Sequence, residues 1–379
     1  MLSLTQEQQM LVESLRDLAE NEFADKAGTW QGERPVENLK TLADHGFLGV
    51  NLPTEYGGGG MSELAAVLVA EVVGRVCPDT AYAVNGQQMV APRAIDMFGT
   101  EAAKERYLPP AIEGETKISI AISEPQAGSD VGAMNTAVEE DGDDFVLNGE
   151  KTWVSGVPHS SAAVVWAKFP EGMGSVIMNF DAAGVEIHQH HTNMAGLTQT
   201  QFYMDDVHIP KEYVLTRGEE GFKQQLYALN WERLGSATTS NAIALCAFDA
   251  ALEYAENREQ FGQPIADFQG MEWKFADMAK ELQASRALVY QAVEEARESG
   301  RPTRFTSSLA NLTSSQMVES VTSEALQVHG ANGYQQGHLL EYLYRFARSR
   351  RIAAGTDEIQ KNGIAGSLKK HGLPHLGGD

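Results

Sequence analysis

The sequence predicts an α+β fold made mostly of helices, with a small antiparallel β domain between two helical regions. Three observations carry this prediction. Apolar residues recur at helical spacing in the first 118 residues, short β-rich segments follow up to about residue 220, and helical spacing then returns. The order helical, β, helical indicates a small sheet domain packed against a helical body. We place the domains at residues 1–118, 119–226 and 227–379.

The first region shows helical spacing in the series Leu11, Leu15 and Leu18. The segment ELAAVLVAEVVGRV at 63–76 is apolar nearly all round, which predicts a buried helix. The glycine run 57–60 before it predicts a loop.

The middle region contains short segments rich in β-branched and aromatic residues, separated by Gly, Asp and Asn. Their spacing of roughly 8 to 12 residues predicts a small antiparallel barrel or sandwich. Asn148-Gly149 predicts a hairpin turn. Trp153 and Ser155, two apart on the strand expected next, would then share one face, where an indole and a hydroxyl could hold a flat aromatic cofactor.

The last region opens with small residues at 235–247, which allow close helix packing, and continues with long amphipathic helices such as 271–299. Cys77 and Cys246 are too few for a disulfide framework, and we expect both to be buried.

The formal net charge is −23, which disfavours nucleic acid and anionic membranes as partners. No apolar run reaches the roughly 18 residues of a membrane span, and the N-terminus lacks the pattern of a signal peptide, so we expect a cytoplasmic protein. Four arginines between residues 345 and 351 form either a local anion site or a solvated helix face. The histidines of EIHQHH at 186–191 have no acidic or cysteine cluster at ligand spacing, so we expect no metal site.

Five segments could carry chemistry, although each alone is a weak signal that an ordinary turn, strand or helix end also explains. They are AISEPQAGSD at 121–130, LNGEKTWVSG at 147–156, REQFGQPIADFQ at 258–269, ALQVHGANGY at 325–334 and IAAGTDEIQ at 352–360. The first and last expose backbone N–H groups of the kind that bind anions.

In this order and spacing, the five segments resemble those of the acyl-CoA dehydrogenase family, and the resemblance covers essentially the whole chain. It implies a C-terminal four-helix bundle, an FAD cofactor, an acyl-CoA substrate, a homotetramer, and electron transfer to an electron-transferring flavoprotein. It also implies a role in fatty acid or amino acid catabolism, including β-oxidation. No GxGxxG motif is present, which agrees with FAD binding outside a Rossmann fold.

The resemblance also implies which residues bind the cofactor. Trp153 would lie along the flavin ring, Ser155 near flavin N5 and Ser123 at the pyrimidine edge, while Ser129 would serve both the pyrophosphate and the pantetheine arm of the substrate. The residues implied for the adenosine half, contributed by a neighbouring subunit, are Arg258, Phe261, Gln269, Gln327 and Gly330. Thr356 and Glu358 would also lie near the FAD.

The family's usual catalytic Glu precedes a Gly-Thr pair, and this chain has Ala354 there. The isovaleryl-CoA dehydrogenase and crotonobetainyl-CoA reductase branches carry the base instead on the first helix after the β domain, and NWERLGSA places Glu232 at that point. Glu232 would take the α-proton while the β-hydride leaves to flavin N5. Arg233 would lie near the thioester, and the Ala354 backbone N–H would still face its oxygen.

Two further positions depart from the family pattern. Ala331 replaces the second glycine of the Gly-Gly pair, and Phe346 replaces the acidic residue of an Arg-Asp-x-Arg segment. Because Ala354 replaces the usual base, three alternatives stay open: an acyl-CoA oxidase or an enoyl-CoA reductase, a desulfinase-like relative, and an inactive FAD- or CoA-binding subunit of a hetero-oligomer. Glu232 argues against the last two.

Overall fold

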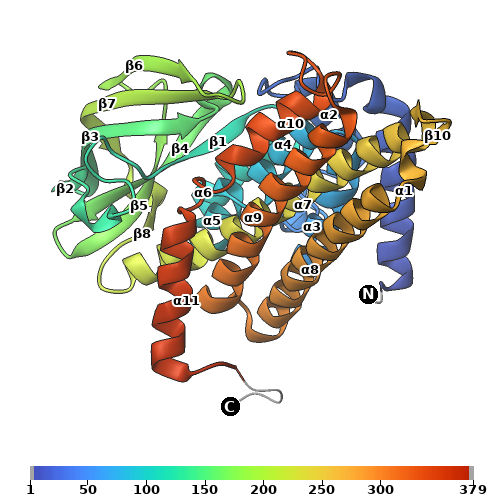
Figure 1. Cartoon of the computed structure of the whole chain (residues 1–379). Coiled ribbons are helices and arrows are strands. Elements are labelled where there is room, and N and C mark those ends of the chain that lie inside the picture. Colours follow the sequence, from blue (N-terminus) through green and yellow to red (C-terminus); the bar gives the residue numbers. More distant parts are fainter. Residues whose placement is uncertain (1–3, 375–379) are drawn as a thin grey trace.

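The computed structural model describes residues 4–374 and arranges them as a β domain beside a helical body (Figure 1). This confirms the predicted fold class and the order helical, β, helical. The N-terminal helices are α1 (Gln6–Glu22), α2 (Val36–Asp44), α3 (Glu63–Val76), α4 (Pro78–Gln88), α5 (Ala91–Phe98) and α6 (Glu101–Ile112).

Local sequence explains where several of these helices begin. Thr5 and Gln8 form a reciprocal capping box at the start of α1. The Thr100 side chain accepts a hydrogen bond from the Ala103 N–H at the start of α6. The apolar helix predicted at 63–76 is α3, and it is buried on nearly all sides.

The β domain is a sheet with the strand order β6-β7-β3-β2-β4-β5-β8. The strands are β1 (Lys117–Ala121), β2 (Ala137–Asp141), β3 (Asp144–Ser155), β4 (Ser160–Phe169), β5 (Gly172–Asn179), β6 (Val185–Thr192), β7 (Thr198–Ile209) and β8 (Val214–Thr216). Most pairs are antiparallel, as predicted. The differences lie at β4, which pairs in parallel with β1, the strand that follows α6, and also with β2 at one position, Ala137 to Lys168.

The predicted hairpin at Asn148-Gly149 is wrong, because both residues lie inside β3. The pairing of β3 with β7 shifts register between Leu147 and Gly149, and a Cβ on Gly149 would come within 2.5 Å of the Thr136 hydroxyl oxygen. The glycine therefore serves a bulge and a close backbone approach. The real β2–β3 turn lies one segment earlier, at Gly142 and Asp143.

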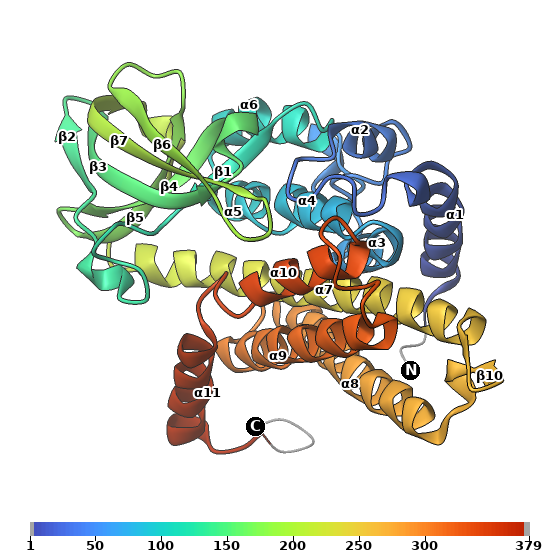
Figure 2. The same ribbon diagram turned by 45° about the horizontal axis from the view of Figure 1, so that its top comes forward.

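The C-terminal region is built on α7 (Gly221–Asn257), a helix of 37 residues. The other elements are α8 (Gln269–Ser299), α9 (Arg304–His329), α10 (Leu339–Ser349), α11 (Asp357–His371) and the short hairpin β9 (Glu259–Gln260) and β10 (Gln263–Pro264). Figure 2 shows α7 running from the β domain to this hairpin at the far end of the molecule.

The small residues predicted to allow close packing do so in the centre of α7, where residues 235–247 are all buried. A Cβ on Gly74 of α3 would come within 2.6 Å of the Ala242 Cβ. The two helices therefore touch along their backbones, which fixes the N-terminal region against α7. Both cysteines are buried, as expected. Among the described helices, none is long and apolar enough to cross a membrane.

Candidate active site

Glu232 lies on α7, one turn before the buried small-residue segment. Its side chain is partly accessible, but the Oε2 atom is buried and has no hydrogen-bond partner among the described residues. Burial raises the pKa of Glu232 to about 7, although Arg233, Arg350 and Lys117 oppose this effect. A carboxylate with this pKa can accept a proton near neutral pH.

The loop that carries Ala354 is held against α7 by side-chain donors. The Ala354 carbonyl accepts hydrogen bonds from Gln360 Nε2 at 3.0 Å and from Arg233 Nε at 3.4 Å. Arg233 also donates to Asn230 Oδ1 at 2.9 Å, so its guanidinium is fixed on both sides. The Ala354 N–H makes no hydrogen bond within residues 4–374, and the residue has a left-handed backbone with φ 56°. The structure thus brings Glu232, Arg233 and Ala354 together.

On the β side, the segment after β1 is joined to β3 by a hydrogen bond from the Thr152 N–H to the Ser123 carbonyl at 2.9 Å. Trp153 follows with φ 58°, at a register shift that interrupts the strand's alternation. Its indole is 54% exposed and lies 5.1 Å from the His191 ring, centre to centre. Because of this register shift, the two-residue spacing between Trp153 and Ser155 is not enough to conclude that their side chains share one face of β3.

Ser155 is connected to the site of Glu232 through Lys117. The Lys117 ammonium donates to the Ser155 carbonyl at 2.6 Å, and the same carbonyl accepts a hydrogen bond from the Ser119 hydroxyl at 3.0 Å. Lys117 is also close enough to Glu232 for each charge to shift the other's pKa. Ser129, the remaining residue expected on this side, is exposed on the loop after β1.

A buried ion pair supports the backbone beneath this region. Lys151 donates to Glu124 at 2.8 Å, and both side chains are almost completely inaccessible. Glu124 also accepts from the N–H groups of Asn135 and Thr136, at 2.5 and 3.0 Å. One carboxylate therefore ties β3 to both ends of the loop that carries Ser129.

The residues expected to bind adenosine lie elsewhere, around the far end of α7. Arg258 ends α7, Phe261 lies in the hairpin turn and is 96% exposed, and Gln269 begins α8. Gln327 and Gly330 lie at the end of α9 and are exposed.

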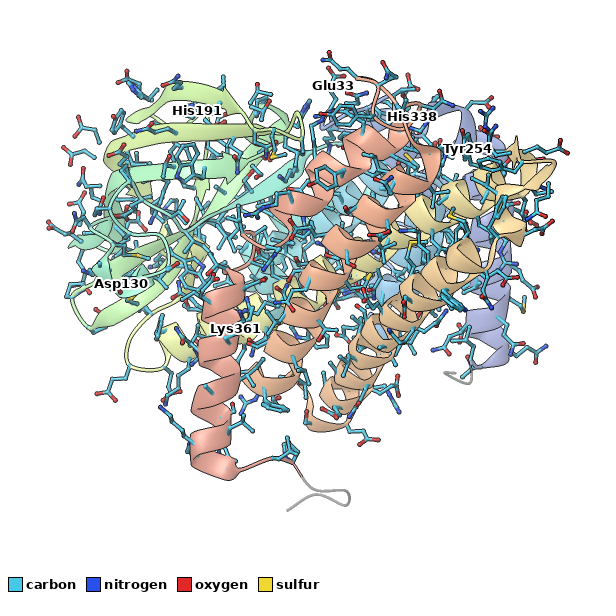
Figure 3. The ribbon with its side chains drawn as sticks, viewed as in Figure 1. Glu33, Asp130, His191, Tyr254, His338 and Lys361 are labelled. Atoms are coloured by element: carbon cyan, nitrogen blue, oxygen red, sulfur yellow. The ribbon has the colours of Figure 1, made fainter. Side chains whose placement is uncertain are left out.

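Tyr254, which stacks on His329, lies at this far end of α7. His191, which lies beside Trp153, belongs to the β domain. Figure 3 labels Tyr254 and His191 on opposite sides of the molecule. Glu232 and Arg258 are 26 residues apart on one helix, which is about 39 Å along its axis. Within one chain, the two sets of predicted cofactor residues are not brought together.

Thr356 and Glu358 lie at the start of α11. The Thr356 side chain accepts from the Ile359 N–H as the N-cap, and Glu358 is exposed in the first turn. The capping role is a sufficient reason for Thr356 without any bound ligand. The structure alone therefore does not show that Thr356 or Glu358 contacts FAD.

The four arginines between residues 345 and 351 do not form one site, because their side chains take different partners. Arg345 pairs with Glu341 one turn earlier and donates to the Met194 carbonyl at 2.6 Å. Glu341 thus supplies the acidic partner that Phe346 cannot, and Phe346 is fully buried in the core. Arg351 pairs with Glu319 and with α11.

Sequence reasoning did not separate Arg350 from its three neighbouring arginines, and it missed Lys117 near Glu232. Arg350 is only 4% exposed, and Lys117 enters from β1, where burial lowers its pKa to about 7. Arg350 lies among other arginines, and Lys117 is a single lysine at the start of a strand. Neither pattern distinguishes a buried cation from an ordinary surface residue. Among residues 4–374 there is no group of three or more potential ligands that could hold a metal ion.

Comparison with known proteins covers almost the whole chain. Family models for the N-terminal, middle and C-terminal domains of acyl-CoA dehydrogenase match residues 5–115, 119–207 and 219–369. A probable acyl-CoA dehydrogenase of Bacillus subtilis, YngJ, is 34% identical over 97% of this chain and 99% of its own length. The CarC subunit of the caffeyl-CoA reductase–Etf complex of Acetobacterium woodii is 33% identical over 97% of this chain and 99% of its own.

The solved structure of butyryl-CoA dehydrogenase from Megasphaera elsdenii is similar, with a TM-score of 0.90 and 27% identity. The match covers 97% of this chain and 100% of that one. These findings confirm the resemblance inferred from the five sequence segments.

Proposed function

Because the chain belongs to the acyl-CoA dehydrogenase family, we propose that it removes two hydrogens from the α and β carbons of an acyl-CoA thioester with Glu232 as the base. The observation that supports this role is the partly accessible carboxylate of Glu232, whose Oε2 has no partner and whose pKa is raised to about 7. Ala354, at the family's usual position, offers no proton acceptor.

The protein is a flavin-dependent oxidoreductase acting on acyl-CoA, and its cofactor is FAD. The residues present fit that cofactor. An exposed indole at Trp153 offers a flat apolar surface that is costly to leave in water, and Ser123 and Ser155 lie on adjoining segments. When bound, FAD supplies the acceptor for the hydride that leaves the β carbon.

The chain's own residues handle the proton and the charge. Glu232 takes the α-proton, and its raised pKa makes it a stronger base than an exposed carboxylate. Negative charge then grows on the thioester oxygen, which the free N–H of Ala354 stabilises by a hydrogen bond. Arg233 and Gln360 hold the carbonyl side of this loop, so its N–H keeps one direction.

The adenosine half of the cofactor is held by a neighbouring copy of the chain. The separation of about 39 Å between Glu232 and Arg258 supports this arrangement. The exposed Phe261 and Tyr334, at 96% and 76%, are apolar groups that an assembly would cover. We infer a homo-oligomer, a tetramer as in the family, that passes electrons to an electron-transferring flavoprotein.

The reverse reaction, reduction of an enoyl-CoA, is the second candidate. It is favoured by the similarity to CarC, a subunit of a reductase–Etf complex. The same similarity supports the flavoprotein partner. Both directions use one proton site, and Glu232 serves either.

The test replaces Glu232 by Gln and compares it with Glu298→Gln, a matched change at an exposed position of α8. Each FAD-loaded protein is mixed without oxygen with straight, branched and polar acyl-CoAs, and loss of the visible flavin absorbance is followed. Glu232→Gln should retain FAD and reduce it about 10²- to 10⁴-fold more slowly, since that is the usual contribution of a general base. Reduction at the rate of the Glu298→Gln control would contradict the assignment.

A further inference from the structure

The surroundings of Glu232 contain more positive charge than the base needs. Against the effect of burial, the pKa of Glu232 is lowered by three nearby positive charges, those of Arg233, Arg350 and Lys117. Burial lowers the pKa of Lys117, and the charge of Arg34 lowers it further. Within residues 4–374, none of these four cations lies within 4.0 Å of a carboxylate oxygen. Among the described residues, Glu232 is the one carboxylate that acts on Lys117, Arg233 and Arg350, so one negative charge faces three buried cations. Such an imbalance is costly unless a further anion binds there.

Three of the four cations hold backbone carbonyls. Arg233 holds the Ala354 carbonyl and is anchored by Asn230, as described above. Arg34 reaches the Thr116 carbonyl at 3.4 Å, just before β1 begins. Lys117 donates to the Ser155 carbonyl at 2.6 Å, which uses one of its three N–H donors. Within residues 4–374, Arg350 holds no backbone group.

Arg350 is buried without an ionic partner. Its Nη2 donates to the Ser236 hydroxyl at 2.5 Å, its guanidinium lies 5.8 Å from the Tyr82 ring centre, and its Nε has no hydrogen bond. A guanidinium has five N–H donors in a fixed fork, which suits a carboxylate. The interaction with one hydroxyl leaves most of that capacity unused.

The position of Arg350 relative to the base is set by α7. Ser236 follows Glu232 by four residues, so the two side chains lie on one face of the helix, about 5 to 6 Å apart at their Cβ atoms. Lys117 approaches from β1, and a Cβ on Gly86 of α4 would come within 4.0 Å of its Cε. The two cations thus reach the surroundings of the base from different elements.

We propose that the acyl group of the substrate carries a second oxyanion, a carboxylate at its distal end, which Arg350 and Lys117 bind. This inference rests on the proposed function of Glu232. Glu232 takes the proton of the α carbon, so that carbon must lie beside it. Ser236, which accepts a hydrogen bond from Arg350, lies one helical turn from Glu232, and a few carbon–carbon bonds span that distance. Burial lowers the pKa of Lys117 to about 7, and a bound carboxylate would favour its charged form.

The test compares glutaryl-CoA with pentanoyl-CoA, which have acyl chains of equal length and differ in the terminal carboxylate. The FAD-loaded enzyme is mixed without oxygen with each, and kcat/KM for flavin reduction is measured. We expect glutaryl-CoA to be preferred by about tenfold or more, since a hydrogen bond to a charged partner contributes at least that much. In Arg350→Gln, this preference should be lost.

The ratio of the two substrates within each variant cancels any effect of Arg350 on the Glu232 pKa. Arg348→Gln is the matched control, because Arg348 is half-exposed and lies 3.7 Å from Glu319. Lys117→Met provides a second variant if Arg350→Gln does not fold, and it should also reduce the preference.

Two results would overturn the proposal: pentanoyl-CoA used as well as glutaryl-CoA by the unaltered enzyme, or an unchanged ratio in Arg350→Gln and Lys117→Met. In either case, reduction by pentanoyl-CoA would leave the proposed function standing. If no acyl-CoA reduces the flavin, the proposed function fails and this inference fails with it.

Discussion

Removing one partner of the buried Glu124–Lys151 pair should destabilise the protein strongly, although the pair as a whole contributes little. Burial disfavours the charge on Glu124, but hydrogen bonds from the Asn135 N–H and from Lys151 lower its pKa to about 2. Burial lowers the pKa of Lys151 to about 8, and Glu124 only partly offsets this.

The two pKa changes have opposite effects on stability. The hydrogen bonds and the ion pair favour the charged form of Glu124, whereas burial disfavours the charged form of Lys151. The favourable contribution of Glu124 is complete above its unfolded pKa of about 4.5 and is lost as the pH falls through about 2. The unfavourable contribution of Lys151 is complete below about pH 8. At neutral pH the two effects oppose each other, as is common for buried pairs.

Glu124→Gln removes the favourable part and leaves a buried ammonium, so we expect a loss of about 3 kcal/mol in the free energy of unfolding. Lys151→Met should cost a similar amount. The double variant should lose much less than the sum, giving a coupling energy of about 3 kcal/mol. Denaturant unfolding at fixed salt, followed by tryptophan fluorescence, measures all four proteins. Additive losses, or no loss in Glu124→Gln, would refute the reasoning.

Two further substitutions separate stability from assembly. Phe261 has φ 55° and is 96% exposed, so Phe261→Gly should relieve about 1 kcal/mol of backbone strain in the FAD-free protein. The same change should lower FAD retention, measured by absorbance after gel filtration, and unchanged FAD content would exclude a role of Phe261 in the neighbouring subunit's site. Tyr342 donates to the buried Asp79, whose other oxygen has no partner, so Tyr342→Phe should cost about 1 to 3 kcal/mol in unfolding free energy, and an unaltered thermal midpoint would argue against this bond.

The fold was readable from the sequence because its three regions differ in period. Leu11 and Leu15 are buried on one face of α1, as their helical spacing predicts, and the apolar segment of α3 is buried all round. The parallel pairing of β1 with β4 could not be predicted, because the direction of a strand in a sheet depends on where the preceding helix ends.

The hairpin prediction at Asn148-Gly149 was wrong for a local reason. An Asn-Gly pair favours a tight turn when nothing else competes, but here Gly149 is needed because Thr136, just before β2, lies too close to β3 for a side chain. Turn preference is a weak effect compared with a strand that is paired on both sides.

The site was predictable only in part. Glu232 stood out because Ala354 lacks a carboxylate, and the raised pKa of Glu232 now gives a physical reason for the assignment. Arg350 was noticed only as one of four arginines, and Lys117 was not noticed, because the burial of a single cation depends on tertiary packing. The role of Glu232 itself stays a prediction until it is tested.

The most direct test of the central claim is the pH dependence of single-turnover flavin reduction in the unaltered enzyme. Burial raises the pKa of Glu232 to about 7, so the base is protonated below this pH and ionised above it. The rate at limiting acyl-CoA should therefore rise with pH, with a midpoint about 7, and this rise should be absent from the residual rate of Glu232→Gln. A rate that does not change between about pH 5 and 9, or the same midpoint in Glu232→Gln, would contradict the account.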